Sequence, residues 1–227
     1  MKNTIICSDR PVTLIGGGSL GAGDLAFSLA HAPLLVAADG GAGQALAAGH
    51  MPRAVFGDLD SLELKDRARI PEDRLFEVAD QNSTDFDKAL LNIEAPLVLA
   101  IGFLGGRIDH QMTAFNILVR HAQRPCILIG EHELIFHLPP KLSLELRAGD
   151  TVSLFPMRPV SGRSTGLAWP IDGLDFAPDG FVGTSNRALG SVHIEMFAKG
   201  ALLVVPRDAL DAVMQGFQAI SSALSGQ

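Results

Sequence analysis

The sequence predicts an α/β N-terminal domain with a mostly parallel sheet flanked by helices, plus a C-terminal antiparallel β-sandwich domain. Up to Gly130, short and near-continuous apolar runs alternate with helical patterns, as in a parallel sheet covered on both faces. After Gly130, short β candidates follow one another across turns that contain Pro and Gly, with nothing helical between them. Pro139-Pro140 interrupts regular structure, so we place the domains at residues 1–138 and 139–227.

Each predicted element follows from its local pattern. The strands expected in the first domain are Val12–Ile15, Leu34–Ala38, Ala54–Phe56, Leu75–Val78, Leu97–Ile101 and Cys126–Ile129. The helices expected between them are Gly23–His31, Thr84–Ile93 and Asp109–His121. The later strands are Leu134–His137, Leu142–Leu146, Thr151–Pro156, Val192–Phe197 and Leu202–Val205. From Asp208 to Gln227 one apolar stripe at helical spacing predicts a C-terminal helix that docks on its own domain or on a partner subunit.

Composition and charge exclude several classes of protein. Of the 227 residues, 47% are hydrophobic and 19% charged, which is typical of a folded domain rather than a disordered chain. The net charge of -7 argues against a nucleic-acid partner. No apolar run reaches the roughly 20 residues that span a bilayer, so we expect a cytoplasmic protein without membrane contact. The two cysteines are too few for a disulfide framework or a tetrahedral zinc site.

Acidic residues gather where the predicted strands end. The residues concerned are Asp39, then Asp58 and Asp60, then Asp80, Asp85 and Asp87, and finally Asp109. The carboxyl ends of parallel strands share one edge of a sheet, so these clusters are expected to converge. Carboxylates brought together repel one another unless a cation compensates, and Mg²⁺ prefers oxygen ligands. A single Asp at a strand end is otherwise a common helix cap, and Thr84 followed by Asp87 is a capping-box variant.

A glycine-rich segment, Gly16–Gly21, matches the pattern G-x-G-x-x-G after a predicted strand. Asp39 follows at the distance at which a dinucleotide-binding fold carries its ribose-binding carboxylate, so an NAD-dependent oxidoreductase is one hypothesis. Glycine-rich loops also cradle phosphates without nicotinamide, and we favour that role for Gly17 and Gly18. A dehydrogenase would leave the later aspartate clusters unexplained.

Six motifs together resemble the thiamine pyrophosphokinase family. They occur in the family's order at Ala38–Ala42, Gly57–Ser61, Thr84–Ala89, Gly106–His110, Ser164–Pro170 and Thr184–Asn186. The resemblance implies a transferase that moves a diphosphoryl group from ATP to thiamine and releases AMP. It also implies a Mg²⁺ cofactor and a homodimer with active sites at the subunit interface.

The resemblance also implies roles for individual residues. It places Mg²⁺ on Asp39, Asp58, Asp60 and Asp85, and catalysis on Asp58, Asp60, Asp85, Arg107 and Asp109. It places the substrates on Gly17, Gly18, Asp39, Gly40, Gln81, Thr84, His110, Ser164, Thr165, Trp169, Ser185 and Asn186. The chemistry fits, because phosphoryl transfer depends on positioning and charge neutralisation. Asp85 is a candidate base for the hydroxyl proton, and Trp169 a candidate stacking partner for the thiazolium ring.

Two features depart from the family pattern. The helix after Val205 has no counterpart in these motifs, and residues 175–180 add an acidic, Pro-containing segment between Trp169 and Thr184. A separate third hypothesis is a thiamine- or nucleotide-binding module without turnover, although a pure binder has no need for so many carboxylates.

Overall fold

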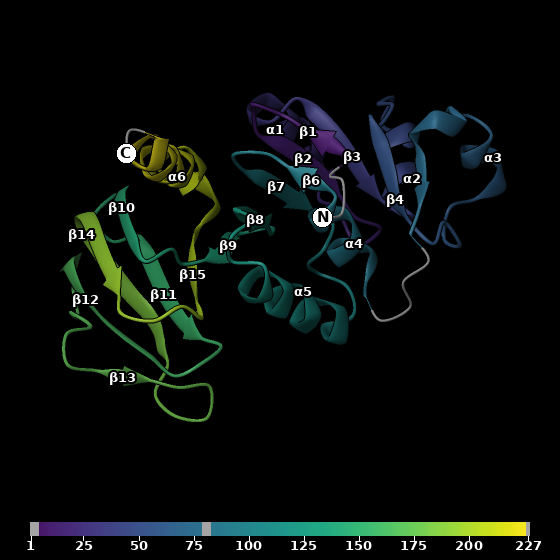
Figure 1. Ribbon diagram of the computed structural model, residues 1–227. Coiled ribbons are helices and arrows are strands. Elements are labelled where there is room, and N and C mark those ends of the chain that lie inside the picture. Colours follow the sequence, from purple (N-terminus) through teal and green to yellow (C-terminus); the bar gives the residue numbers. More distant parts are fainter. Residues whose placement is uncertain (1–4, 79–82, 226–227) are drawn as a thin grey trace. The chain divides into compact units, whose positions relative to one another are not determined.

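The computed structural model describes residues 5–78 and 83–225 of the chain, which is drawn in Figure 1. The chain forms two compact units, residues 1–114 and 115–227, and each is described here by itself. This division falls inside helix α5 (Ile108–Arg120). The domain boundary between residues 138 and 139 remains a prediction from the sequence.

The first unit contains a parallel sheet. Its strands are β7 (Val98–Ile101), β2 (Val12–Ile15), β3 (Leu34–Ala38), β4 (Ala54–Gly57) and β5 (Leu75–Glu77), paired side by side in that order. Strands β2, β4 and β7 are buried along their whole length, which explains their continuous apolar sequences. These strands therefore confirm the predicted parallel pairing and, to within two residues, the predicted bounds.

Helices connect the strands of this unit. They are α1 (Asp24–His31), α2 (Gly41–Ala47), α3 (Leu64–Arg67), α4 (Asp85–Leu91) and α5, with a 3₁₀ turn at Glu72–Arg74. The predicted helix Thr84–Ile93 corresponds to α4, and its predicted end at Ile93 was wrong. Ile93 is buried and begins a two-residue strand, β6 (Ile93–Glu94), which pairs in parallel with β1 (Ile6–Cys7). The pattern of the sequence predicted neither α2 and α3 nor this short ladder.

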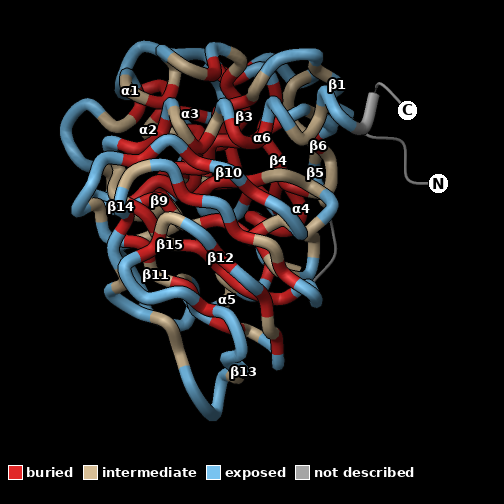
Figure 2. Tube along the Cα trace, turned by 90° about the vertical axis from the view of Figure 1, so that its left-hand side faces the viewer, coloured by how far each residue is buried: buried red, intermediate tan, exposed pale blue. Residues whose placement is uncertain are grey.

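The second unit is an antiparallel ladder. Its strands are β8 (Cys126–Ile129), β9 (Glu133–His137), β10 (Lys141–Glu145), β11 (Thr151–Pro156), β12 (Val160–Leu167), β13 (Asp175–Phe176), β14 (Gly183–Met196) and β15 (Ala201–Pro206). They pair in the order β13-β12-β14-β11-β15-β9-β8, and β10 also pairs with β14. Buried and exposed residues alternate along several of these strands, and Figure 2 shows this as changes of colour along the trace.

The sequence analysis missed β12 and β13, and it recognised only the last part of β14. Strand β14 has 14 residues, while the prediction began at Val192. The missed segments are rich in Gly and Ser and contain an Asn, and Gly and Asn are residues that strands seldom contain. Pairing with β11 at Gly183, Asn186 and Arg187 and with β12 at Ala188 places Gly183–Ser191 in a strand despite its composition.

The C-terminal helix α6 (Leu210–Ser225) packs on β10 of its own unit, as one of the two predicted ways of docking it requires. Leu210, Val213 and Phe217 are buried, and the ring of Phe217 packs edge-on against Phe136 at 5.5 Å between centroids. Gly216 allows the close approach, because a Cβ there would lie 3.0 Å from Leu142 Cδ1. A 3₁₀ turn at Arg207–Ala209 leads into the helix.

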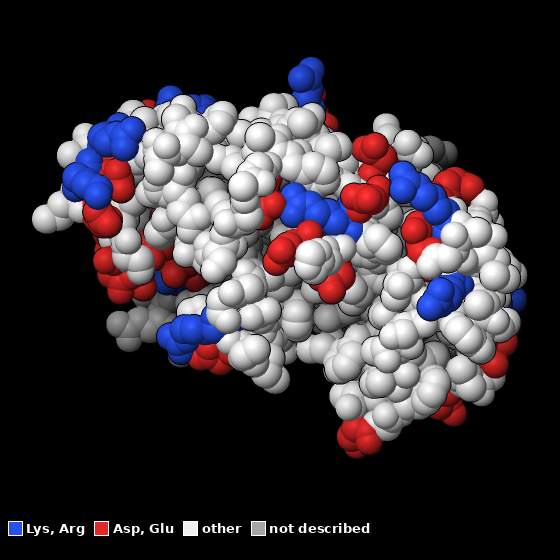
Figure 3. Space-filling model, turned by 180° about the vertical axis from the view of Figure 1, so that it is seen from behind, with Lys and Arg blue, Asp and Glu red and all other residues white. Residues whose placement is uncertain are grey.

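Among the described residues, no helix combines the length and the apolar character needed to cross a bilayer. Lys and Arg side chains alternate with Asp and Glu on the face of the molecule shown in Figure 3, without a continuous basic stretch there.

Candidate active site

Three aspartates lie together at the carboxyl ends of β3 and β4. Asp39 follows β3 directly, and Asp58 and Asp60 follow β4. Each offers a carboxylate oxygen, and the three oxygens lie within 4.8 Å of one another. The convergence expected from the sheet edge is thus present for these three residues.

The backbone around these carboxylates is held in an uncommon conformation. Asp39 has φ 43° and Leu59 has φ 62°, both in the left-handed region that residues other than glycine seldom adopt. Leu59 is 5% exposed, whereas Asp58 and Asp60 on either side of it are exposed. Its buried side chain anchors the loop while both neighbouring carboxylates face outward. Such strain concentrates at functional sites, where the surrounding structure maintains it.

Asp39 is the buried member of the set, at 5% exposure. Burial raises the pKa of its carboxyl group, a hydrogen bond from Ser61 opposes the rise, and the charge of Asp85 adds to it. Its Oδ1 is buried and has no hydrogen-bond partner among the described residues. A buried carboxylate oxygen left unpaired is costly, and a bound cation would satisfy it. The donor set therefore fits a hard divalent cation such as Mg²⁺.

A buried lysine joins two of the predicted metal ligands. Lys88 Nζ lies 3.0 Å from Asp85 Oδ1 and 3.5 Å from Asp58 Oδ2, and its side chain is 4% exposed. Burial alone would lower the pKa of Lys88, but the two carboxylates outweigh this effect and raise it. For Asp58, burial would raise the pKa, but the hydrogen bond from the Asp60 N–H and the charge of Lys88 outweigh it, so the pKa is lowered. Because Gly57 has no Cβ, the Asp85 carboxylate can lie close to it; an added Cβ would be 3.2 Å from Asp85 Oδ1.

Lys88 lies inside the motif Thr84–Ala89, but the sequence pattern did not indicate a role for it. The available signal was its position three residues after Asp85 on a predicted helix, where i,i+3 side chains meet. That spacing does not reveal the second contact with Asp58, which comes from another strand.

Thr84 and Gly40, two of the predicted substrate-binding residues, cap helices in the structure. Thr84 is the N-cap of α4, and its hydroxyl accepts a hydrogen bond from the Asp87 N–H at 3.4 Å, which agrees with the capping alternative. Gly40 precedes α2 as its N-cap, beside Ser61. Gln81, expected on the thiamine side, and Asp80 of the acidic cluster lie outside the described residues.

The glycine-rich loop packs against the end of β7. The Gly18 N–H donates to the Gly102 carbonyl at 2.9 Å, and a Cβ on Gly18 would lie 2.6 Å from that oxygen. Gly18 is thus required by the close approach of two backbones. At Gly17, in contrast, the nearest atom to an added Cβ is 3.6 Å away and the residue is exposed. Gly17 is therefore free for the predicted phosphate contact.

Arg107 and Asp109 form an exposed pair of their own at the start of α5. Arg107 Nε donates to Asp109 Oδ1 at 3.1 Å and Nη2 donates to Oδ2 at 2.5 Å, while the His110 N–H also donates to Oδ1. Among the described residues, no hydrogen bond or ion pair joins these three residues to the carboxylates of Asp39, Asp58 and Asp60. The guanidinium lowers the pKa of Asp109.

In the second unit, Trp169 and Asn186 bind each other. The Trp169 N–H donates to Asn186 Oδ1 at 3.1 Å, and Asn186 Nδ2 donates to the Trp169 carbonyl at 2.6 Å. The indole is 60% exposed. Ser185 precedes Asn186 with φ 62°, and its N–H donates to Ser153 Oγ at 2.9 Å.

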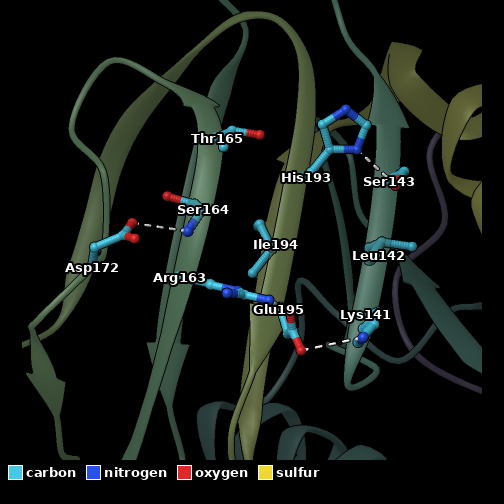
Figure 4. A pocket seen from close by; sticks show the side chains of 10 residues that line it. All are labelled: Lys141, Leu142, Ser143, Arg163, Ser164, Thr165, Asp172, His193, Ile194 and Glu195. Carbon is cyan, nitrogen blue, oxygen red and sulfur yellow. Dashed lines mark hydrogen bonds and ion pairs between the residues drawn. The ribbon is translucent and has the colours of Figure 1, made fainter.

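Ser164 and Thr165 point in different directions from β12, because successive residues of a strand face opposite sides. Ser164 is 8% exposed; its N–H donates to Asp172 Oδ2 at 3.0 Å and its Oγ accepts from the Ile171 N–H. Thr165 is exposed and lines a cavity of about 230 Å³ on the outer face of β10, β12 and β14, with His193 beside it (Figure 4). Ser164 also lines this cavity, but its Oγ is engaged by the Ile171 N–H.

Two family models match the chain. "Thiamin pyrophosphokinase, catalytic domain" matches residues 26–129, and "Thiamin pyrophosphokinase, vitamin B1 binding domain" matches residues 136–199. The first match contains the aspartate cluster and the second contains Trp169 and Asn186.

Curated relatives carry the same description. Thiamine pyrophosphokinase 1 of Oryza sativa subsp. japonica is 31% identical over 156 residues, or 60% of this chain and 59% of the relative. The chain thus spans less than two thirds of that relative's length. Thiamine pyrophosphokinase of Bacillus subtilis (strain 168) is 26% identical and is covered to 86%.

Solved structures share the fold. The thiamine pyrophosphokinase structure from Bacillus subtilis matches with a TM-score of 0.71 and 22% identity, covering 87% of this chain and 98% of that one. The thiamin pyrophosphokinase from Candida albicans matches with a TM-score of 0.74 and 16% identity, covering 91% and 95%.

Proposed function

The chain belongs to the thiamin pyrophosphokinase family, and from this premise we propose that it transfers a diphosphoryl group from ATP to thiamine. The hydroxyl oxygen of thiamine attacks the β-phosphorus, the bond between that phosphorus and the α,β-bridging oxygen breaks, and AMP leaves with that oxygen. The hydroxyl proton is lost, and thiamine diphosphate is the second product. The observation that carries the proposal is the set of three carboxylates at the edge of the parallel sheet, within the region matched by the catalytic model.

We propose Mg²⁺ as the cofactor, held by Asp39, Asp58 and Asp60 with Asp85 beside them. The unpaired buried Oδ1 of Asp39 and the 4.8 Å limit on the three oxygens support this assignment. When bound, the ion neutralises charge on the phosphates of ATP. The chain's own part is to orient the carboxylates, through the strained loops at Asp39 and Leu59 and through Lys88.

The other reacting groups have separate proposed roles. Gly17 and Gly40 bind phosphate oxygens, whereas Gly18, which the sequence also suggested, already donates its N–H to the Gly102 carbonyl. Arg107 supplies a forked donor once it exchanges its Asp109 partner for substrate. Asp85 is the proposed base, although its Oδ1 is engaged by Lys88 and only the other oxygen is free of that contact. Trp169 stacks on the thiazolium ring of thiamine.

We further propose that the C-terminal unit is the thiamine-binding β-sandwich and that the protein acts as a homodimer. The match of residues 136–199 to the vitamin B1 binding model supports the first statement. The exposed indole of Trp169 supports the second, because it offers a stacking surface to a site completed by another subunit.

The test is AMP formation from ATP, with thiamine and Mg²⁺ each present or omitted, and mass detection of thiamine diphosphate. We expect AMP only when both are present, and loss of product in Asp58→Asn. The exposed Asp73→Asn serves as the matched control and should retain activity. Thiamine binding without AMP would instead indicate a non-catalytic module. Failure to bind either substrate, together with nicotinamide binding, would restore the oxidoreductase hypothesis, which the comparisons do not favour.

A further inference from the structure

Trp169 is exposed, so packing of its side chain does not fix its position. The indole is 60% accessible to solvent, and the chain has no other tryptophan. A residue that presents an exposed ring for stacking must be held by its main chain, because a mobile ring loses conformational entropy when a ligand binds. The question is therefore what holds the backbone of Trp169.

The antiparallel pairing of β12 with β14 reaches almost to this residue. Leu167 pairs with Ala188, and the Ala168 N–H donates to the Arg187 carbonyl at 2.8 Å. Pro170 follows Trp169 and has no N–H, so a ladder cannot continue beyond it. Trp169 is the last residue that the ladder can hold.

The side chain of Asn186 takes the place of a peptide group at this last position. Its Oδ1 accepts the Trp169 N–H and its Nδ2 donates to the Trp169 carbonyl, so both polar main-chain groups of Trp169 are engaged. The Arg187 N–H donates to the same Oδ1 at 2.8 Å, and two backbone donors on one oxygen fix the orientation of the amide. Both lone pairs of Oδ1 and one Nδ2 hydrogen are thereby used.

An irregularity in β14 next to Asn186 sets the direction of its side chain. The pairing of β11 with β14 shifts register between Val152 and Leu154, opposite Thr184 and Ser185. Ser185 adopts φ 62° within this bulge, and Ser153 Oγ receives its N–H. Bulges re-aim side chains near binding sites, and the strained Ser185 conformation needs such support.

We propose that Asn186 is a positioning residue, which acts on thiamine by holding the backbone of Trp169 rather than mainly by its own contact with the substrate. This inference rests on the proposed function for its link to thiamine. The mechanical part, that Asn186 immobilises Trp169, is independent of any ligand.

The test uses the fluorescence of the full-length protein, because one Trp and no Tyr means that emission reports on Trp169 alone. Time-resolved anisotropy is measured for the wild type, Asn186→Ala, Asn186→Asp and Ser191→Ala. Asn186→Asp keeps the acceptor but loses the amide donor. Ser191→Ala changes an exposed polar residue of the same strand, which bonds Glu145 instead. Thiamine titrations and KM values for thiamine and ATP follow.

We expect a faster local anisotropy decay in Asn186→Ala, an intermediate decay in Asn186→Asp, and wild-type behaviour in Ser191→Ala. The Kd and KM for thiamine should rise about tenfold in Asn186→Ala while the KM for ATP stays within about twofold. If the Ala variant does not fold, the Asp variant supplies the comparison. Unchanged anisotropy in both Asn186 variants overturns the proposal. If thiamine does not change the emission of the wild type and no AMP forms, the proposed function is refuted. The anisotropy measurement still decides whether Asn186 immobilises Trp169.

Discussion

Lys88 lies 3.0 Å from the carboxylate of Asp85 although its own side chain is 4% exposed. The same ammonium reaches Asp58 at 3.5 Å. A cation of the chain itself thus stands between carboxylates of two different elements, α4 and the loop after β4. It offsets part of their mutual repulsion, which would otherwise oppose folding of this edge.

Replacing Lys88 with Met should destabilise the protein in the absence of divalent ions by about 1–2 kcal/mol. The loss is smaller than for a fully buried pair, because both carboxylates reach solvent. Mn²⁺ or Mg²⁺ should then raise the melting temperature more in Lys88→Met than in the wild type, because more repulsion remains to be offset. Lys65→Met, which removes an exposed pair with Glu63, is the control and should change stability little. Equal stability of Lys88→Met and wild type in chelator would contradict this account.

The aspartate cluster predicts a divalent site that can be measured without turnover. Asp58→Asn and Asp60→Asn should each weaken Mn²⁺ binding by at least about tenfold, measured by titration calorimetry, since each removes a charged ligand. Asp73→Asn, which changes an exposed carboxylate away from the cluster, should bind as the wild type does. Retained affinity in both cluster variants would exclude this site.

The two glycines of the N-terminal loop should respond differently to the same change. Gly18→Ala would place a Cβ 2.6 Å from the Gly102 carbonyl oxygen, so we expect a lower melting temperature. Gly17→Ala has space, so its stability should be unchanged while the KM for ATP rises if its backbone meets a phosphate. An unchanged KM in Gly17→Ala would remove this loop from the proposed nucleotide site.

Trp169→Ala should raise the KM for thiamine about 2- to 30-fold, as expected for the loss of a cation–π contact. The KM for ATP should change less, and Trp169→Phe should recover part of the loss. Because the indole is exposed, the melting temperature should stay close to that of the wild type. Equal losses for both substrates, or unfolding, would argue that the ring is structural.

His137 should make the protein less stable in acid. Burial, with Lys199 and Arg158 nearby, lowers its pKa from 6.5 to about 4, and its Nε2 is buried without a hydrogen-bond partner among the described residues. Above pH 6.5 neither the folded nor the unfolded form is protonated at this residue. Between about pH 6.5 and 4 the unfolded chain binds a proton that the folded chain does not, so the unfolding free energy falls as the pH falls.

The measurement for His137 is urea unfolding at pH 7 and pH 5. His137→Gln lacks this proton, so the stability difference between wild type and variant should shift by about 2 kcal/mol in favour of the variant at pH 5. The exposed His50→Gln is the matched control and should show no such shift. A constant difference at both pH values would show that His137 is not held neutral by its surroundings.

The sequence alone predicted the five strands of the parallel sheet in the first unit, though not the short β1–β6 ladder, because buried parallel strands are continuous apolar runs that local pattern reveals. It also placed Asp39, Asp58 and Asp60 at one edge, since the carboxyl ends of neighbouring parallel strands coincide. It missed β12 and most of β14, whose Gly, Ser and Asn residues become strand only through pairing with strands that lie elsewhere in the sequence.

The local sequence pattern therefore predicted most of the strands, the carboxylates that share a sheet edge and the family that the motifs resemble. Only the tertiary structure decided that Oδ1 of Asp39 is buried without a partner, that Lys88 joins Asp58 to Asp85, and that Asn186 holds Trp169. The physical reason is range: propensity and periodicity act over a few neighbours, whereas burial and side-chain pairing depend on residues that are distant in sequence.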